Sequence, residues 1–274
     1  LAVRRQRQMC IRDRYTSLAV GFSKEWAEQD LFLSFGYAEV EALVGNPMNS
    51  SVGYSSWTYF NDVDRDNPSL GVSQFEIPER MSAYMRWSPT LFADLESRFS
   101  LTWSHNKGRP YSFVFNGYPD MRGDALDGDG DNMLLYVPTG PNDPNVVFAD
   151  GFDTDAFFAT MDSYGFERGA FVDRGQHYSP WYARLNFKFE QMLPGLRTND
   201  QSSVFFTIRN LGNFLNDEWG IYNFQSDHDI VDGQALNDGV DQYYIYRNFR
   251  GLRDKGRSGR GSSYLVKIGF SYRF

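Results

Sequence analysis

The chain has 274 residues and a formal net charge of −8, and this acidic balance argues against a nucleic-acid partner. Its single cysteine excludes a disulfide framework or a cysteine-based metal site within the chain. No stretch approaches the ~18 consecutive apolar residues of a transmembrane helix, so a membrane location would require β-strands. Aromatic residues make up 17% of this polar chain, which favours alternation of apolar and polar residues over long apolar blocks.

The first 14 residues differ from everything that follows them. Residues 4–14 read RRQRQMCIRDR and hold five arginines together with the only cysteine. A reverse translation of this string resembles the primer tail and transposon end of a common DNA-sequencing library adapter. We therefore expect residues 1–14 to be a non-native adapter translation, which removes Cys10 as a candidate thiol site. The biological segment would then be residues 15–274.

Alternation of apolar and polar residues is the dominant pattern in the rest of the chain. Because a strand points successive side chains to opposite faces, this pattern predicts strands with one apolar face. Such segments occupy residues 17–23, 31–38, 81–88, 97–105, 181–191, 203–210 and 262–274, with a shorter candidate at 220–225. Only residues 155–166 suggest a short helix, so the sequence predicts an all-β chain.

Short and long connections alternate between the predicted strands. The short ones are KEWAEQD, PTLFADLE and LPGLRTNDQ, and the long ones span 43–77, 108–180 and 226–261. Long loops without evident structure count against a compact soluble domain and are typical of one side of an outer-membrane barrel. The alternation of strand directions predicts one more strand within 108–180, which the pattern does not locate.

Two all-β architectures fit these strands. In a soluble sandwich the apolar faces enclose a shared core, whereas in an outer-membrane barrel they face lipid and the polar faces line the lumen. Charges in the middle of the polar faces favour the barrel, because they suit a wet or plugged lumen; they are Arg86, Arg98, Arg184, Lys188, Arg209 and Lys267. Trp and Tyr residues near the strand ends also favour it, since such rings are stable at membrane interfaces.

Four segments carry distinctive motifs: NKGRPYSFVFNG at 106–117, GDGDNMLLYVP at 128–138, RGQHYSPWYARLNFKFEQ at 174–191 and FTIRNLGNFLNDEWG at 206–220. These segments resemble the C-terminal part of TonB-dependent outer-membrane receptors, and most closely the Oar-like group. Asn186 stands where the third motif would carry Asp. Tyr272 and Phe274 belong to a terminal Tyr-Arg-Phe that resembles the signal read by the barrel-assembly machinery. The likeness covers residues 76–274, and 15–75 more loosely.

The resemblance implies the C-terminal part of an antiparallel transmembrane β-barrel, with about 8–10 strands of a 22-stranded barrel. It implies ligand capture by the long extracellular loops and import past a plug, driven by the TonB complex through N-terminal regions. The partners would be outer-membrane lipid and lipopolysaccharide, the barrel-assembly machinery and an unidentified small or oligomeric ligand. The location would be the outer membrane of a Gram-negative bacterium. Candidate ligand-contacting residues in the loops are Tyr54, Trp57, Tyr59, Phe60, Tyr243, Tyr244 and Tyr246.

No catalytic or cofactor-binding motif is visible, so we expect no enzyme and no cofactor. Asp127, Asp129 and Asp131 form a weak calcium candidate, but the EF-hand pattern fails because Asn132 and Pro138 occupy its Gly and Glu positions. A solvated loop is the simpler interpretation of these residues. The three histidines lack partners at metal-ligand spacing, and the basic run at 253–261 is interpreted as a flexible loop.

Two other functions stay open at this point. One is a small self-contained outer-membrane barrel that acts as a pore or adhesin, which an upstream plug domain and TonB box would exclude. The other is a soluble β-sandwich binding module. Partition of the full-length protein with outer-membrane fractions and heat-modifiable migration on gels would exclude the sandwich.

Overall fold

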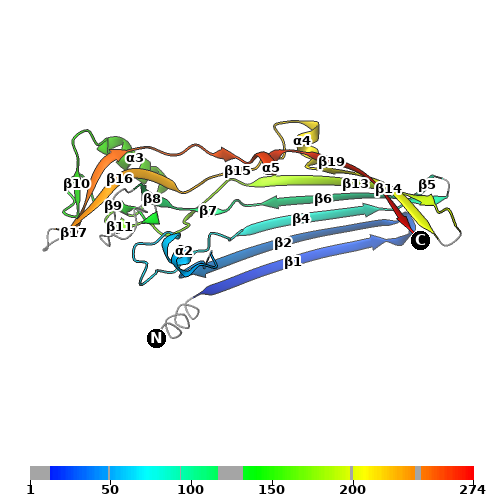
Figure 1. The fold of residues 1–274 in the computed structure, drawn as a ribbon, viewed down its shortest axis with the longest axis horizontal. Coiled ribbons are helices and arrows are strands. Elements are labelled where there is room, and N and C mark those ends of the chain that lie inside the picture. The colour runs from blue at the N-terminus through cyan, green and yellow to red at the C-terminus, as the bar shows by residue number, and fades with distance from the viewer. Residues whose placement is uncertain (1–12, 49, 93, 117–131, 198–199, 238–241) are drawn as a thin grey trace.

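The computed structural model describes residues 13–48, 50–92, 94–116, 132–197, 200–237 and 242–274. Its main sheet contains seven strands in the order β1-β2-β4-β6-β13-β14-β19, and the short strands β3 and β5 pair with β2 and β6 (Figure 1). The seven strands are β1 (Arg14–Trp26), β2 (Leu31–Val44), β4 (Glu79–Trp87), β6 (Leu95–Asn106), β13 (Tyr182–Pro194), β14 (Gln201–Arg209) and β19 (Leu265–Arg273). All neighbours along this path are antiparallel, so the predicted all-β, antiparallel class is confirmed.

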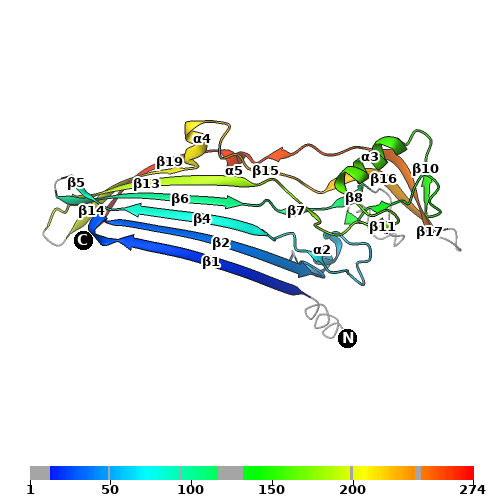
Figure 2. The same ribbon diagram turned by 180° about the vertical axis from the view of Figure 1, so that it is seen from behind.

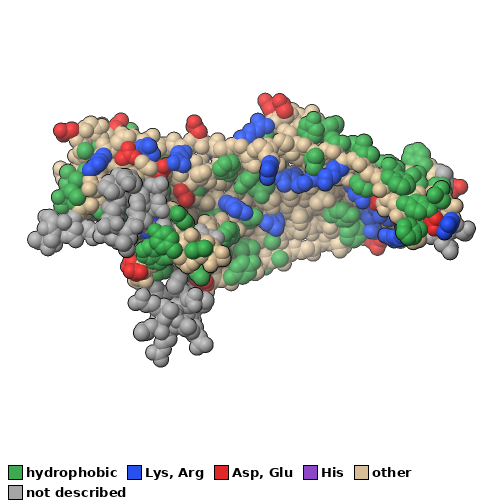
Figure 3. Space-filling model, in the orientation of Figure 1, with side chains coloured by type: hydrophobic (Ala, Val, Ile, Leu, Met, Phe, Trp, Pro, Cys, Tyr) green, Lys and Arg blue, Asp and Glu red, His purple; other side chains and the backbone are tan. Residues whose placement is uncertain are grey.

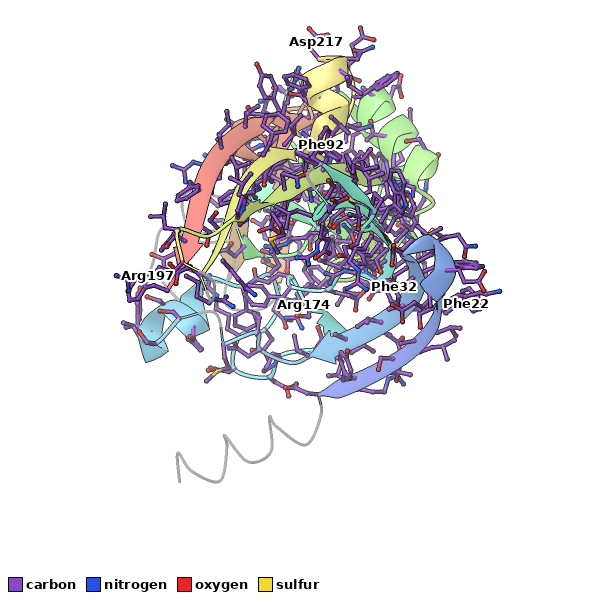
Figure 4. All side chains as sticks on the ribbon, turned by 90° about the vertical axis from the view of Figure 1, so that its right-hand side faces the viewer. Phe22, Phe32, Phe92, Arg174, Arg197 and Asp217 are labelled. Carbon is purple, nitrogen blue, oxygen red and sulfur yellow. The ribbon has the colours of Figure 1, made fainter. Side chains whose placement is uncertain are left out.

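The alternation in the sequence sorts side chains between the two faces of this curved sheet. Phe22 pairs with Phe35, and Phe35 with Ala83, along a row of apolar residues. The neighbouring row carries Phe32 and Arg86. Viewed along the strands, Phe22 lies on the outer side of the curve and Phe32 on its inner side (Figure 4). The outer row is open to solvent in this structure, as Phe22 is 64% exposed.

The inner face is polar and carries basic side chains at mid-strand. In register, Arg86 pairs with Ser100, Ser100 with Lys188, and Lys188 with Thr207. Thr207 pairs in turn with Lys267. Lys and Arg side chains form a band across the middle of the sheet in Figure 3. The sheet therefore has one apolar face and one charged face, as the sequence pattern predicts.

The sheet is open, and its connections differ at its two ends. Among the described residues, β1 and β19 are edge strands that do not pair with each other. Short turns join the strands at one end, while three long connections, residues 45–78, 107–181 and 210–264, gather at the other (Figure 1). Strand directions alternate correctly because β6 pairs directly with β13. The prediction of an extra main-sheet strand within 108–180 is therefore wrong.

The long connections contain regular structure of their own rather than open loops. Their strands are β3 (Gly71–Val72), β7 (Pro110–Tyr111), β8 (Phe113–Asn116), β9 (Tyr136–Val137), β10 (Val146–Phe148), β11 (Ala170–Phe171), β12 (His177–Tyr178), β15 (Asn223–Phe224), β16 (His228–Asn237), β17 (Gln242–Phe249) and β18 (Gly256–Arg257). A four-stranded sheet forms in the order β10-β17-β16-β8. Together with residues 133–137 and 152–172, this sheet builds an apolar core around Phe113, Phe115, Phe157, Ile230 and Tyr246. We call the described parts of the three long connections together the loop domain.

Helix α3 (Thr154–Tyr164) packs against this core and confirms the suggested helix at 155–166. The Asp153 carboxylate accepts a hydrogen bond from the Ala156 amide at 2.9 Å, which caps the first turn. Gly165 ends the helix at φ 71, a left-handed conformation that suits glycine. Phe157, Phe158 and Met161 are buried on one face. The helix forms because an N-cap, a C-terminal glycine and an apolar stripe coincide.

The remaining helices are short: η1 (Ala27–Gln29), α2 (Gly53–Thr58), α4 (Leu211–Leu215) and α5 (Gly259–Ser262), while β5 covers Thr90–Phe92. Helix α4 follows β14 and stands off the sheet in both opposite views (Figures 1 and 2). Within the part of the chain that the structure describes, no helix is long and apolar enough to cross a membrane.

Candidate ligand-binding site

A cavity of about 500 Å³ lies where the three long connections meet the ends of the main strands. The first connection contributes Tyr59, Phe60, Asn61 and Gln74 to its lining. The second contributes Arg109, Ser112, Arg174 and Ser179, and the third Tyr222, Phe224, Gln225 and Asp227. This volume lies within the range of small-molecule sites, and segments more than 100 residues apart in the chain share its walls.

Arg174 holds the first connection to the second. Its guanidinium donates hydrogen bonds to the backbone carbonyls of Gly45 at 3.0 Å, Asn61 at 3.2 Å and Ser69 at 3.1 Å, and to that of Val44. Gly71 allows this approach, because a Cβ at that position would lie 2.7 Å from the Arg174 side chain. Arg174 is therefore a structural cation that cross-links the cavity wall.

The charge of Arg174 is balanced within the wall. Its Nη1 lies 3.5 Å from Oδ2 of Asp62, and both side chains are almost completely buried. Burial raises the pKa of Asp62, and the hydrogen bonds from backbone amides and the charge of Arg174 oppose that rise. Burial lowers the pKa of Arg174, while Asp62 opposes this shift. The pair therefore contributes little net charge to the cavity.

Asp227 joins all three connections at the cavity floor. Its carboxylate accepts a hydrogen bond from the Asn61 side-chain amide at 2.7 Å and another from the Ser112 backbone amide at 2.6 Å. Burial raises the pKa of Asp227, which these hydrogen bonds and Arg253 oppose. The Ser179 hydroxyl accepts a hydrogen bond from the Gln225 backbone amide at 3.0 Å beside it. These contacts make the floor a cross-linked polar surface.

His228 and His177 lie next to the floor but belong to the core of the loop domain. Nδ1 of the buried His228 accepts a hydrogen bond from the Arg253 backbone amide at 3.0 Å. Burial lowers the pKa of His228 to about 4, so its imidazole is neutral at pH 7. Its ring lies 4.8 Å from that of Phe113, and burial lowers the pKa of His177 as well. Both act as packing residues. His105 lies at the end of the main sheet, where its ring is tilted against that of Trp181.

The aromatic ligand candidates divide between the cavity, the surface and the core. Tyr59 is exposed and lines the cavity, and Phe60 lines it from a buried position. Tyr54 is exposed on α2, close to Trp57. Tyr244 and Tyr246 were expected on a ligand-contacting surface, but both are buried in the core of the loop domain, where Tyr246 packs against Phe115. They are therefore core residues, because Phe157 of α3 packs against Tyr246 and Tyr136 of β9 packs against Tyr244.

Tyr243 is half-buried on β17, and it does not line the cavity. The calcium candidate Asp127, Asp129 and Asp131 lies outside the described residues. Among the residues that the structure does describe, no cluster of three or more His, Cys, Asp or Glu side chains has the geometry of a metal site.

Sequence reasoning missed three charged residues of the cavity: Arg109, Arg174 and Asp227. The first two lie in the motifs NKGRPYSFVFNG and RGQHYSPWYARLNFKFEQ, where single arginines stand beside glycines in long connections. Asp227 immediately precedes β16, between Ser226 and His228. An isolated charge in such a position was the available signal, but it does not reveal which charges meet in space.

A scan against protein-family models, a search of curated proteins and a search of solved structures each found no match to this chain.

Proposed function

We propose that residues 15–274 form the C-terminal part of the barrel of a TonB-dependent outer-membrane receptor of the Oar-like group. The observation that carries this proposal is that the two faces of one antiparallel sheet, and its two ends, differ in chemistry. Its outer face presents apolar side chains, its inner face presents basic ones, and its long connections at one end build a domain around a polar cavity. In a barrel, the apolar face would contact lipid and the basic face would line a hydrated or plugged lumen. The long connections would capture the ligand outside the cell.

The role that follows is binding of a ligand by the loop domain and import driven by the TonB complex. The complex would act through N-terminal regions that include a plug. The last strand, with Tyr272 and Phe274, would engage the barrel-assembly machinery. Outer-membrane lipid and lipopolysaccharide would surround the apolar face. The proposal assigns no enzymatic reaction and no cofactor.

The sheet itself argues against the two alternatives. A soluble sandwich would bury the apolar face against a second sheet, whereas Phe22, Ile268 and Phe270 are 64%, 76% and 64% exposed. A self-contained small barrel would pair its first and last strands, whereas β1 and β19 stay apart in the part of the chain described. Such unpaired edges are costly in lipid because their backbone groups find no water.

Cell fractionation of a bacterium that expresses the complete gene tests the proposal. We expect the protein in the outer-membrane fraction, with a faster-migrating band on gels when the sample is not boiled. Deletion of the TonB gene should abolish ligand uptake without changing the amount of receptor. Recovery of the protein from the soluble fraction would refute the membrane proposal, and uptake that persists without TonB would leave the pore or adhesin alternative.

A further inference from the structure

We propose that the cavity binds a small monocarboxylate whose acid group pairs with Arg109 and whose body offers a flat apolar face to the surrounding rings. This inference deepens the proposed receptor function by naming the ligand class of its loop domain. It rests on the proposed function only in taking the bound carboxylate to be the imported ligand. Binding of a carboxylate by the cavity depends on the geometry of the loop domain alone.

Protein groups already engage the charges of Arg174 and Asp227. Both terminal nitrogens of Arg174 donate to backbone carbonyls and one pairs with Asp62, so that only its buried Nε lacks a partner. Both carboxylate oxygens of Asp227 accept hydrogen bonds. A ligand that recruited either group would have to break these buried hydrogen bonds, and a buried polar group left without its partner is destabilising. The floor therefore shapes the cavity and does not supply its anchoring charge.

Arg109 differs from the floor residues because its side chain is exposed and lines the cavity. Within the described residues its guanidinium makes no ion pair. Its backbone is nevertheless held in place, since its carbonyl accepts a hydrogen bond from the Ser179 amide at 2.9 Å. The adjacent Gly108 lies so close to Ser179 that a Cβ there would be only 2.4 Å from it. A fixed backbone thus presents an available guanidinium.

Aromatic rings from two other connections line the same cavity. Tyr59 is 52% exposed and Phe224 is 36% exposed, so their ring surfaces are open to a ligand. Tyr222 lies beside Phe224, with ring centroids 6.3 Å apart, and it is close enough to Arg109 to interact electrostatically. Gln74 and Gln225 add neutral donors and acceptors. Rings and neutral amides next to one cation suit a ligand with a flat face, hydroxyl or amide groups and one acid group.

A carboxylate fits this site better than a phosphate. The planar guanidinium binds a carboxylate through two parallel hydrogen bonds. Asp227 lies in the wall of the same cavity, and its negative charge would oppose a dianion more strongly than a monoanion. The two nearest sources of this chemistry are a uronic acid unit of an oligosaccharide and the free carboxyl end of a short aromatic peptide. Both place a carboxylate beside a flat face.

Calorimetric titration of the complete, detergent-solubilised receptor tests the inference. The probes are a glucuronic acid disaccharide and a dipeptide with a C-terminal phenylalanine, each beside its carboxamide counterpart. We expect at least one acid to bind, and its carboxamide to bind at least tenfold more weakly, because a charge-assisted bond is lost. Arg109→Gln should weaken binding of the acid to a similar extent, and Arg109→Lys should restore part of the affinity.

Arg197→Gln is the matched control, because Arg197 is an exposed arginine in the short turn between β13 and β14, at the end of the main sheet opposite the long connections (Figure 1). It should leave the affinity unchanged. Equal affinity of Arg109→Gln and the unmodified protein, equal affinity of acid and carboxamide, or no binding of either acid at millimolar concentration would each overturn the inference. If the protein lies in the outer membrane and binds neither acid, the carboxylate inference is refuted and the receptor proposal stands. If the protein is soluble and binds one acid, the receptor proposal is refuted and the carboxylate inference stands.

Discussion

At the scale of single residues, the junction after β14 shows how a few contacts hold the loop domain to the sheet. Asn210 adopts φ 55, and its side-chain amide donates to the carbonyls of Gly220 at 2.9 Å and Ser262 at 3.0 Å. Its backbone amide donates to the Asn186 side chain at 2.9 Å. Asn186 stands where the resembled motif carries Asp, and its side-chain oxygen still supplies an acceptor. One residue therefore links β13, β14 and the third connection.

Gly220 is required at this junction for two reasons. It adopts φ 61, and a Cβ there would lie 2.0 Å from the Asn210 side-chain oxygen. We expect Gly220→Ala to lower the free energy of unfolding by more than the ~1–2 kcal/mol that a left-handed alanine costs by itself. Urea titration monitored by heat-modifiable migration measures this. Gly251→Ala is the control, because Gly251 has φ 76 but open space around it; equal losses in the two variants would contradict the role of Asn210.

His228 should make the loop domain sensitive to acid. Its pKa is lowered by burial to about 4, so the folded state binds fewer protons than the unfolded state between that pH and about 6.5. The stabilisation is thus complete above pH 6.5 and is lost as the pH falls towards 4. The charged groups that face His228 are Asp229 and Arg253, and His177 is a further titratable neighbour.

Limited proteolysis of the loop domain at pH 7 and pH 5 measures this sensitivity. We expect faster cleavage at pH 5 in the unmodified protein. His228→Asn should reduce the ratio of the two rates, whatever its effect on stability at pH 7. His105→Asn serves as the control, because His105 lies on the main sheet beside Trp103 and Trp181. An unchanged ratio in His228→Asn would assign the acid sensitivity to other groups.

At the scale of elements, α4 and the turn that follows it expose large apolar side chains. Phe214, Leu215 and Trp219 in and after this helix are 45%, 65% and 57% exposed. Phe214 contacts Tyr264, which immediately precedes β19, with ring centroids 5.2 Å apart. Asp217, in the turn that follows the helix, lies outside the curve of the sheet in Figure 4. In the proposed membrane orientation, α4 would lie at the level of the outer-leaflet headgroups.

We expect Trp219 to contact lipid if this orientation holds. Brominated lipids quench tryptophan fluorescence at short range, so reconstitution of the complete receptor into such lipids reports the contact. Trp219→Phe should remove a quenched component of the emission. Trp57→Phe is the comparison, because Trp57 lies in the loop domain with Arg65 over its ring, and it should remove an unquenched component. The same quenching in both variants would place α4 away from the lipid.

At the scale of the whole molecule, the open sheet sets the limit on independent folding. Strand β1 pairs over its full length with β2 and presents its other edge unpaired within the described residues. Unpaired strand edges favour aggregation in water, and they are costly in lipid. The loop domain has a core of its own, so the two parts need not fail together.

We therefore expect residues 15–274, expressed alone, to form no sealed barrel. Refolding into detergent should yield aggregates and no heat-modifiable band, and added protein should not form defined pores in liposomes. Extension of the chain by upstream strands that complete the barrel should produce soluble protein in detergent, a heat-modifiable band and defined pores in liposomes. A monodisperse preparation of residues 15–274 that imports ligand would contradict this expectation.

The sequence by itself determined the seven main strands, their two faces and the helix at α3, because these depend on the period of side chains along a short segment. It also placed the short and long connections in the correct alternation. Only the tertiary structure decided what the long connections do. Asn61 and Asp227 are 166 positions apart and share a hydrogen bond. Tyr246 is a core residue because Phe157 of α3 packs against its ring and its hydroxyl donates to the Tyr136 carbonyl. Contacts of this kind depend on how distant segments pack, and no local pattern encodes them. For the same reason Arg109, Arg174 and Asp227 became one site only in three dimensions.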